Sequence, residues 1–170
     1  MTSMIQVEIR PVAALHPHPR NARQHTPAQI AQIAASLTEY AWTFPILIDE
    51  HNQVIAGHGR LMAAKKLAHD DVPVIVARNW SEAQKRAYMI ADNKLTDNSS
   101  WDEALLAKEL NDLKGVGIDV EGLGFEADEI DDLLKKLAES QPPDEFQSYD
   151  EEIAIEHTCP RCNYKWSGGT

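Results

Sequence analysis

The tetrapeptide Gly57-His58-Gly59-Arg60 combines two flexible residues with two side chains that can bind anions. Residues 54–56 before it suit a short strand, and residues 61–67 after it are helix formers with an apolar stripe. The N–H groups and the dipole at the start of a helix attract phosphate. Arg60 adds a bidentate phosphate ligand, and His58 titrates near neutrality. The stretch therefore predicts an anion-binding turn. The alternative is a strand-to-helix turn that binds nothing.

A second basic segment lies upstream, in Pro19-Arg20-Asn21-Ala22-Arg23. Residues 15–25 contain two prolines, three histidines and two arginines, which predicts a rigid cationic loop and no regular element. Arginines on a proline-stiffened loop can meet the helix start and surround a polyanion from two sides. The functional interpretation is a phosphate site for a nucleotide or nucleic acid, and the alternative is a solvated basic loop.

Asp92-Asn93-Lys94 follows at the end of a predicted helix. A carboxylate beside an amide can hold a magnesium ion bound to a nucleotide, because hard cations prefer oxygen ligands and often keep phosphates as well. A polar helix end without a ligand is the alternative interpretation of these three residues.

Cys159 and Cys162 form a C-x-x-C pair that is followed by Asn163 and an aromatic residue, the usual form of one zinc knuckle. A structural zinc ion needs four ligands, so the pair is half a zinc ribbon. His157 is a third candidate ligand, and a dimer can supply two halves. The alternatives are a redox pair, whose βαβ context is missing, and a tail without a metal.

The elements that position these residues follow from hydrophobic periodicity and from turn signals. Predicted strands cover 5–9, 45–49, 54–56 and 72–77, where Pro73 favours an edge or a strand start. Predicted helices cover about 27–40, 82–95, 101–113 and 127–137. In the second helix Ala83, Ala87, Ile90 and Ala91 are expected on the packed side, and in the third Leu105, Leu106, Leu110 and Leu113. Residues 139–152, rich in Pro, Gln, Ser and acid, read as a linker.

Composition limits the function classes further. The net charge of −11 is uneven, because residues 1–100 hold ten Lys and Arg against nine Asp and Glu, whereas residues 101–170 hold six against eighteen. Six of the seven histidines also precede residue 101, so a basic face for nucleic acid is compatible with the acidic total. We find no membrane-length apolar run and no secretory signal, and we expect a cytoplasmic protein. G-x-S-x-G, Walker A, H-E-x-x-H and paired-carboxylate signatures are absent from the sequence.

Four motifs in order resemble the ParB N-terminal domain of the ParB/sulfiredoxin superfamily: residues 19–23, 55–60 with the following Ala63-Ala64, 82–88 and 91–95. The chain also looks like the ParB-like nuclease-domain proteins of phages and prophages, which are often joined to a DNA methyltransferase. The resemblance covers residues 5–137. It departs from partition ParB in lacking paired arginines in the second box. It departs from sulfiredoxin in having no cysteine there, most simply because His58 replaces it, so sulfur chemistry is not supported.

The resemblance implies an α+β fold, with a small mixed sheet and helices around a nucleotide pocket. We expect a nucleotide-binding domain over 1–98, a helical extension over 99–138, an acidic linker over 139–156 and a half zinc-ribbon tail over 157–170. We find no obvious helix-turn-helix module after the first domain, so specific centromere binding is not expected. No methyltransferase motif follows either.

The same resemblance implies the site residues. Gly57, His58, Gly59 and Arg60 would bind phosphates, Asn21 and Arg23 would form the first basic box, and Asp92 and Asn93 would lie near Mg²⁺. His58 and Asp92 are the candidate catalytic residues. Cys159 and Cys162 are the candidate Zn²⁺ ligands.

These residues lead to three hypotheses. The first is a stand-alone ParB-like protein that binds CTP or ATP with Mg²⁺ and acts on or near DNA in a phage modification or partition context. Its partners would be DNA, a DNA methyltransferase or other modification protein, and a second copy in a homodimer. The second is an enzyme, either a metal-dependent nuclease or an ATP-using phosphotransferase. The third is an adaptor with a vestigial pocket.

Overall fold

The computed structural model describes residues 6–140 and 157–166. The chain divides into two compact units, residues 1–138 and residues 139–170, which are described separately below. Most of the predicted linker over 139–156 lies outside the described residues. In the described ranges, none of the helices combines the length and hydropathy needed to cross a bilayer.

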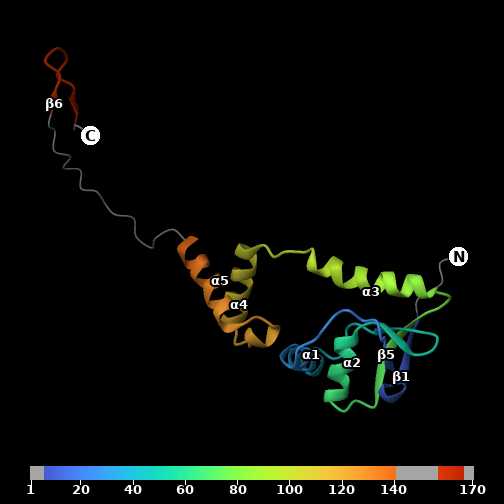
Figure 1. Cartoon of the computed structure of the whole chain (residues 1–170). Coiled ribbons are helices and arrows are strands. Elements are labelled where there is room, and N and C mark those ends of the chain that lie inside the picture. Colours follow the sequence, from blue (N-terminus) through green and yellow to red (C-terminus); the bar gives the residue numbers. More distant parts are fainter. Residues whose placement is uncertain (1–5, 141–156, 167–170) are drawn as a thin grey trace. The chain divides into compact units, whose positions relative to one another are not determined.

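The first unit contains a five-stranded mixed sheet and five α-helices (Figure 1). Its strands are β1 (Val7–Pro11), β2 (His16–Pro17), β3 (Ile46–Asp49), β4 (Gln53–Ala56) and β5 (Asp71–Ala77). Its helices are α1 (Pro27–Tyr40), α2 (His58–Lys66), α3 (Glu82–Asp97), α4 (Glu103–Gly115) and α5 (Ala127–Ser140), with short 3-10 turns η1 (Val12–Ala14) and η2 (Glu121–Leu123). The predicted α+β class is therefore confirmed.

The sheet has the strand order β1-β5-β3-β4-β2. β3 and β4 form the predicted antiparallel hairpin, and β3 runs parallel to β5. Because β5 lies between β1 and β3, the prediction of an edge strand there is wrong. Pro73 is tolerated because it pairs with Ile9 of β1, while pairing with β3 begins one residue later at Val74. Residues 15–25 are also not entirely a loop, since β2 pairs with β4 in parallel.

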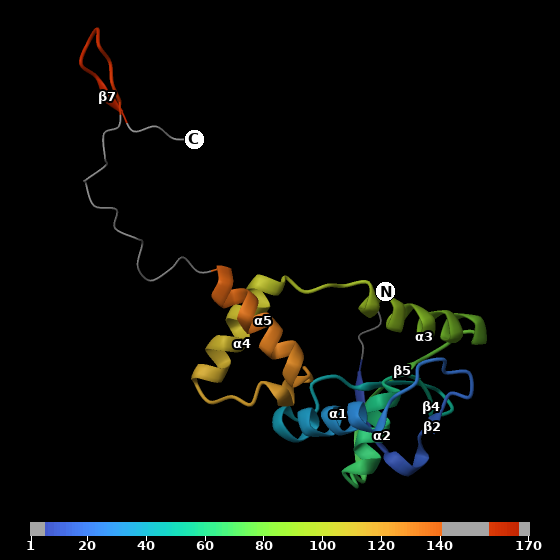
Figure 2. The same ribbon diagram turned by 60° about the vertical axis from the view of Figure 1, so that its left-hand side comes forward.

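The two faces of the sheet bury different helices, as the alternation of side chains along a strand requires. On one face, Val54 and Val74 pack with Leu61 and Ala64 of α2 in a core cluster. On the other face, Ile55 of β4 packs with Met89 of α3. α1 lies beside α2 (Figure 2). The sheet therefore fixes the start of α2 and the length of α3 relative to each other.

Helix α3 has the predicted bounds at its start but buries a different face. Ser81 caps it through a capping box with Gln84. The residues expected to be packed, Ala83, Ala87, Ile90 and Ala91, are exposed. The buried residues of α3 are Lys85 and Met89. The predicted face is wrong because an apolar count cannot anticipate that a lysine is drawn inward by a distant carboxylate.

Helices α4 and α5 lie side by side in both views (Figures 1 and 2) and share a hydrophobic cluster of their own. Leu110, Ile130 and Leu133 form its centre, with Leu106, Leu113, Leu134 and Leu137 packed around it. Leu105, which we expected inward, is 56% exposed. The cluster gives this helical extension a core separate from that of the sheet.

Candidate nucleotide site

The start of helix α2 forms one wall of the site. β4 ends at Ala56, and Gly57 then adopts a left-handed backbone conformation with φ of 93° that a side chain would strain. The helix begins at His58, three residues earlier than predicted, so His58, Gly59 and Arg60 all lie in its first turn. Helix geometry leaves the first N–H groups of this turn without intrahelical acceptors. The predicted strand, glycine turn and helix start are thus present, with the helix N-terminus displaced to His58.

Gly59 allows α1 to approach α2 closely. A Cβ atom at this position would lie 2.8 Å from Cδ1 of Ile33 and 3.1 Å from Cε1 of His25, both tighter than ordinary contacts. We expected Gly59 to serve phosphate binding. Its absent side chain also serves helix packing, which places the residues of α1 beside those of α2.

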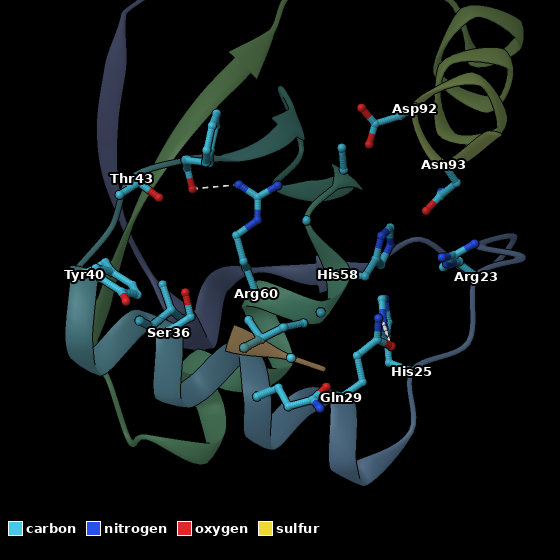
Figure 3. A pocket seen from close by; sticks show the side chains of 18 of the residues that line it. Arg23, His25, Gln29, Ser36, Tyr40, Thr43, His58, Arg60, Asp92 and Asn93 are labelled. Atoms are coloured by element: carbon cyan, nitrogen blue, oxygen red, sulfur yellow. Dashed lines mark hydrogen bonds between the residues drawn. The ribbon is translucent and has the colours of Figure 1, made fainter. Parts of the chain in front are cut away.

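Arg60 reaches along the cavity and holds the chain that leads into β3. Its Nη1 donates to the carbonyl oxygens of Phe44 at 2.7 Å and Pro45 at 3.0 Å (Figure 3). Burial lowers the pKa of the Arg60 guanidinium, and the carboxylate of Asp92 opposes that shift. The hydrogen bonds that Arg60 makes to described residues use one terminal nitrogen, so the rest of the guanidinium can meet an anion.

His58 is held as a neutral hydrogen-bonding group. Its Nε2 accepts a 3.2 Å hydrogen bond from the backbone N–H of His18, which assigns the remaining ring proton to Nδ1. Burial, then the charges of His25 and His18, lower the pKa of His58 from 6.5 to about 4. The occupied Nε2 and the lowered pKa make His58 a poor general base, although we had selected it as a catalytic candidate.

The loop before α1 places Asn21 and Arg23 on the same cavity. The side chain of Asn21 accepts a hydrogen bond from the N–H of Arg23 and donates one to the carbonyl of Arg23. The Arg23 guanidinium donates to both carboxylate oxygens of Asp97 at the end of α3, at 2.9 and 3.2 Å. Asn21 therefore shapes the loop, while Arg23 is a half-exposed cation with a partner that an anion would have to compete with.

Asp92 and Asn93 face the cavity from α3. Nδ2 of Asn93 donates to the carbonyl of Met89, so the amide oxygen is the part of this side chain available to a ligand. Burial, then the charge of Asp92 and a hydrogen bond to it, raise the pKa of Tyr88. Of the described residues that line the cavity, Asp92 is the single carboxylate.

The predicted residues meet in one cavity of about 550 Å³. Figure 3 shows Ser36 and Tyr40 of α1 on one side and Asp92 and Asn93 of α3 on the other, with Arg60 between them. Every nucleotide-site residue predicted from the sequence lines it: Asn21, Arg23, Gly57, His58, Gly59, Arg60, Asp92 and Asn93. The polar residues of α1, and Gly122 to Gly124 at η2, also line the cavity and were not predicted.

A buried ion pair that sequence reasoning missed fixes α3 against the hairpin. Nζ of Lys85 lies 2.7 Å from Oδ2 of Asp49, and also 2.7 Å from Oε1 of the exposed Glu82. Oδ1 of Asp49 accepts from the N–H groups of His51 and Gln53 in the β3–β4 turn. Burial alone would raise the pKa of Asp49, but Lys85 and the backbone donors outweigh it and lower that pKa. A lysine at an internal helix position was the available signal.

The described part of the second unit is a hairpin of β6 (His157–Thr158) and β7 (Lys165–Trp166). Cys159 and Cys162 are both free thiols in its turn. Hydrogen bonds from the backbone N–H of Arg161 and the backbone and thiol of Cys162 lower the pKa of Cys159. The ring of His157 stacks on Trp166. Among residues 6–140 and 157–166, no three His, Cys, Asp or Glu side chains are grouped to hold a metal ion.

Comparison with known proteins identifies two matching families. The ParB N-terminal domain matches residues 2–93. The ParB-methyltransferase HTH domain matches residues 104–159, so our expectation that no helix-turn-helix module follows the first domain is wrong. The module was not apparent because its helices are joined by eleven residues that include η2, longer than the usual three- or four-residue turn, and because the segment is acidic.

One relative and two solved structures are similar to the chain. The ParB-like nuclease domain-containing protein YnaK of Escherichia coli K12 is 44% identical over 86 residues, which cover 51% of this chain and 99% of YnaK. The structure of the C-terminally truncated chromosome-partitioning protein ParB of Caulobacter crescentus, complexed with CTP-γ-S, is 18% identical with a TM-score of 0.64. That match covers 78% of this chain and 79% of that one.

A sulfiredoxin structure from Arabidopsis thaliana matches 49% of this chain and 97% of its own, at 14% identity and a TM-score of 0.42. The family match over more than half of the chain agrees with the motifs and with the observed fold. The chain therefore belongs to the ParB N-terminal domain family.

Proposed function

We propose that this protein binds a nucleoside triphosphate with Mg²⁺, either CTP or ATP, in the cavity between α1, α2 and α3, and acts on or near DNA. The observation that carries the proposal is the convergence of three separate sequence motifs on one cavity. Its volume of about 550 Å³ lies within the ordinary range for small-molecule sites, about 300–1,000 Å³.

The cavity divides naturally between a phosphate end and a nucleoside end. The first turn of α2 offers backbone N–H groups and a helix dipole to phosphate, and Arg60 and Arg23 add positive charge. Gln32, Ser36 and Tyr40 of α1 line the other side and offer hydrogen-bonding groups to a base or ribose. The chemistry of the lining therefore supports a ligand that is anionic at one end and polar and planar at the other.

A magnesium ion fits the α3 side of the cavity. Mg²⁺ is usually held by one or two carboxylates together with substrate phosphates and water. Asp92 supplies one carboxylate, and the amide oxygen of Asn93 lies one residue further along the helix. When bound with the nucleotide, the ion would neutralise phosphate charge, and Asp92 would position it.

The similar proteins support the choice of ligand and partner. The Caulobacter ParB structure holds a CTP analogue, which makes CTP the first nucleotide to test. The match of residues 104–159 to a ParB-methyltransferase HTH domain supports binding to DNA and association with a DNA methyltransferase or other modification protein, as in a phage or prophage system. A homodimer is proposed on the same family basis.

The second candidate function is enzymatic, as a metal-dependent nuclease or an ATP-using phosphotransferase. The description of YnaK as a nuclease-domain protein favours testing it. In this chain Asp92 would have to handle protons, since the Nε2 of His58 already accepts a hydrogen bond. An adaptor with a vestigial pocket is the third hypothesis.

Isothermal titration of the full chain with CTP, ATP and GTP in Mg²⁺ tests the pocket. We expect saturable binding of CTP or ATP, and weaker binding by at least about tenfold for Arg60→Ala, because a charge-assisted contact is lost. Arg23→Gln is a second variant, because Arg60 also holds the chain at Phe44. Arg78→Gln, which changes an exposed arginine paired with Glu8, is the control and should bind as the wild type does. No heat with any nucleotide would overturn the proposal.

Incubation with labelled ATP, and separately with plasmid, distinguishes a binding protein from an enzyme. A binding protein leaves both nearly unchanged with or without Mg²⁺. Magnesium-dependent cleavage that Asp92→Asn abolishes would favour the enzyme. Nucleotide binding without DNA binding at any salt concentration would contradict the DNA part of the proposal.

A further inference from the structure

The hairpin of the second unit has a turn built to present two sulfur atoms. The N–H of Cys159 donates to the carbonyl of Tyr164 at 2.8 Å, and the N–H of Asn163 donates to the carbonyl of Cys159 at 2.9 Å. Asn163 has a left-handed backbone with φ of 59°, the conformation for which we described it as glycine-like. The backbone N–H groups of Arg161 and Cys162 point at the Cys159 thiol, and the Cys162 thiol contacts it.

This hairpin has too little packing to persist by itself. Each strand has two residues, and an isolated two-stranded hairpin is at best marginally stable in water. Its large side chains are stacked in the open, since Tyr164 is 69% exposed and Trp166 is 43% exposed. Small folds of this kind are usually stabilised by a disulfide, a metal or a partner chain.

The chain itself supplies half of a zinc site. Structural Zn²⁺ takes four ligands in tetrahedral geometry, and Cys159 and Cys162 are the two cysteines in all 170 residues. The neighbouring His157 is occupied by stacking on Trp166, with ring centroids 5.5 Å apart. A second copy of the same hairpin provides the two missing thiolates and closes a two-fold symmetric site.

The charge of the hairpin suits such a shared site. Zinc bound by four thiolates carries a net negative charge, and each copy brings the cations Arg161 and Lys165 close to it. The other acidic residues of the segment precede the hairpin, so within residues 157–166 the balance is positive. A second positive hairpin is therefore neutralised by the metal and its thiolates instead of being repelled.

We propose that two copies of this chain bind one Zn²⁺ between their C-terminal hairpins, through Cys159 and Cys162 of each copy. The site joins the chains independently of the nucleotide cavity. Each thiol loses its proton when it binds zinc, and no electron is transferred.

The test uses the full chain, reduced, loaded with Zn²⁺ and freed of excess metal. Metal analysis should find about one zinc for every two chains, and X-ray absorption should find four sulfur neighbours at about 2.3 Å. Analytical ultracentrifugation should show a loss of self-association when a chelator removes the zinc. Cys159→Ser with Cys162→Ser should bind no zinc and show no chelator effect, with thermal unfolding of the first unit unchanged.

Asn163→Gly is the matched control within the same turn, because glycine adopts the left-handed conformation and leaves both thiols in place. It should keep the zinc and the chelator-sensitive association. The proposal is overturned if each chain binds its own zinc with mixed sulfur and nitrogen ligands. It also fails if the reduced chain retains no zinc, or if the double serine variant keeps the metal.

Discussion

Nζ of Lys85 lies 2.7 Å from Oδ2 of Asp49, and the two side chains are 8% and 3% exposed. The pair joins the middle of α3 to the β3–β4 turn, 36 residues away in the sequence. Because α3 carries Asp92 and the hairpin leads into Gly57, this contact sets the width of the candidate nucleotide site.

Lys85→Met should lower the free energy of unfolding by about 3–5 kcal/mol, because it leaves the Asp49 carboxylate buried without its partner. Adding Asp49→Asn should recover part of the loss, since the amide oxygen still accepts from the turn N–H groups. Lys136→Met is the control: its 2.7 Å pair with Glu103 is more than 60% exposed at both side chains, and the loss should stay below about 1 kcal/mol. Urea unfolding measures all three, and equal losses for Lys85 and Lys136 would contradict this account.

The lowered pKa of His58 makes the fold sensitive to moderate acid. The folded protein keeps His58 neutral down to about pH 4, whereas the unfolded chain protonates it near 6.5. The unfolded state therefore binds more protons between these values, and stability should fall by roughly 3 kcal/mol as the pH drops from 6.5 to 4. The contribution is fully present above pH 6.5.

His58→Gln should flatten this pH dependence, since the amide can accept the hydrogen bond of His18 without titrating. His16→Gln, which changes an exposed histidine, should keep the wild-type slope. Urea unfolding at a series of pH values measures the effect. A variant at position 58 with an unchanged slope would show that another group causes the acid sensitivity.

Gly59→Ala should destabilise the protein by about 1–3 kcal/mol, because its Cβ would lie 2.8 Å from Cδ1 of Ile33. The higher helix propensity of alanine offsets part of this loss. Ile33→Val removes that atom, so the double variant should be more stable than the sum of the single losses predicts. Gly115→Ala has open space around it and should be nearly neutral in the same thermal unfolding experiment. Additive losses would indicate that Gly59 does not limit the approach of α1.

Asp92→Asn should remove much of the dependence of nucleotide binding on Mg²⁺. Affinity in Mg²⁺ should fall about tenfold to a hundredfold, because a charged ligand of the ion is lost. Affinity without Mg²⁺ should stay equal or rise, since a carboxylate no longer repels phosphate. Asp112→Asn, on the exposed surface of α4, is the control. Titration with and without EDTA measures both, and an unchanged magnesium effect would place the ion elsewhere.

Local signals in the sequence were sufficient for much of the fold. The Thr26-Pro27 start predicted α1, and the apolar run 45–49 with the polar turn after it predicted the β3–β4 hairpin. The resemblance in four motifs then predicted which residues meet, and the cavity contains all of them. These features depend on neighbours in the sequence or on motifs that belong to a known family.

Contacts between distant residues could not be predicted in this way. The buried face of α3 depends on Asp49, which no periodicity in residues 82–97 reveals. The hydrogen bond from His18 to His58 turned a candidate base into a neutral donor, and it too joins residues 40 positions apart. The strand β2 escaped prediction because its pairing with β4 involves two residues and one of them is a proline.

A crystal structure of the full chain with Mg²⁺ and a non-hydrolysable CTP or ATP analogue tests the central claim most directly. The account predicts phosphate oxygens within hydrogen-bonding distance of the backbone N–H groups in the first turn of α2, with Arg60 beside them and Asp92 toward the metal. A saturating nucleotide bound outside this cavity, or a cavity left without nucleotide under those conditions, would contradict it.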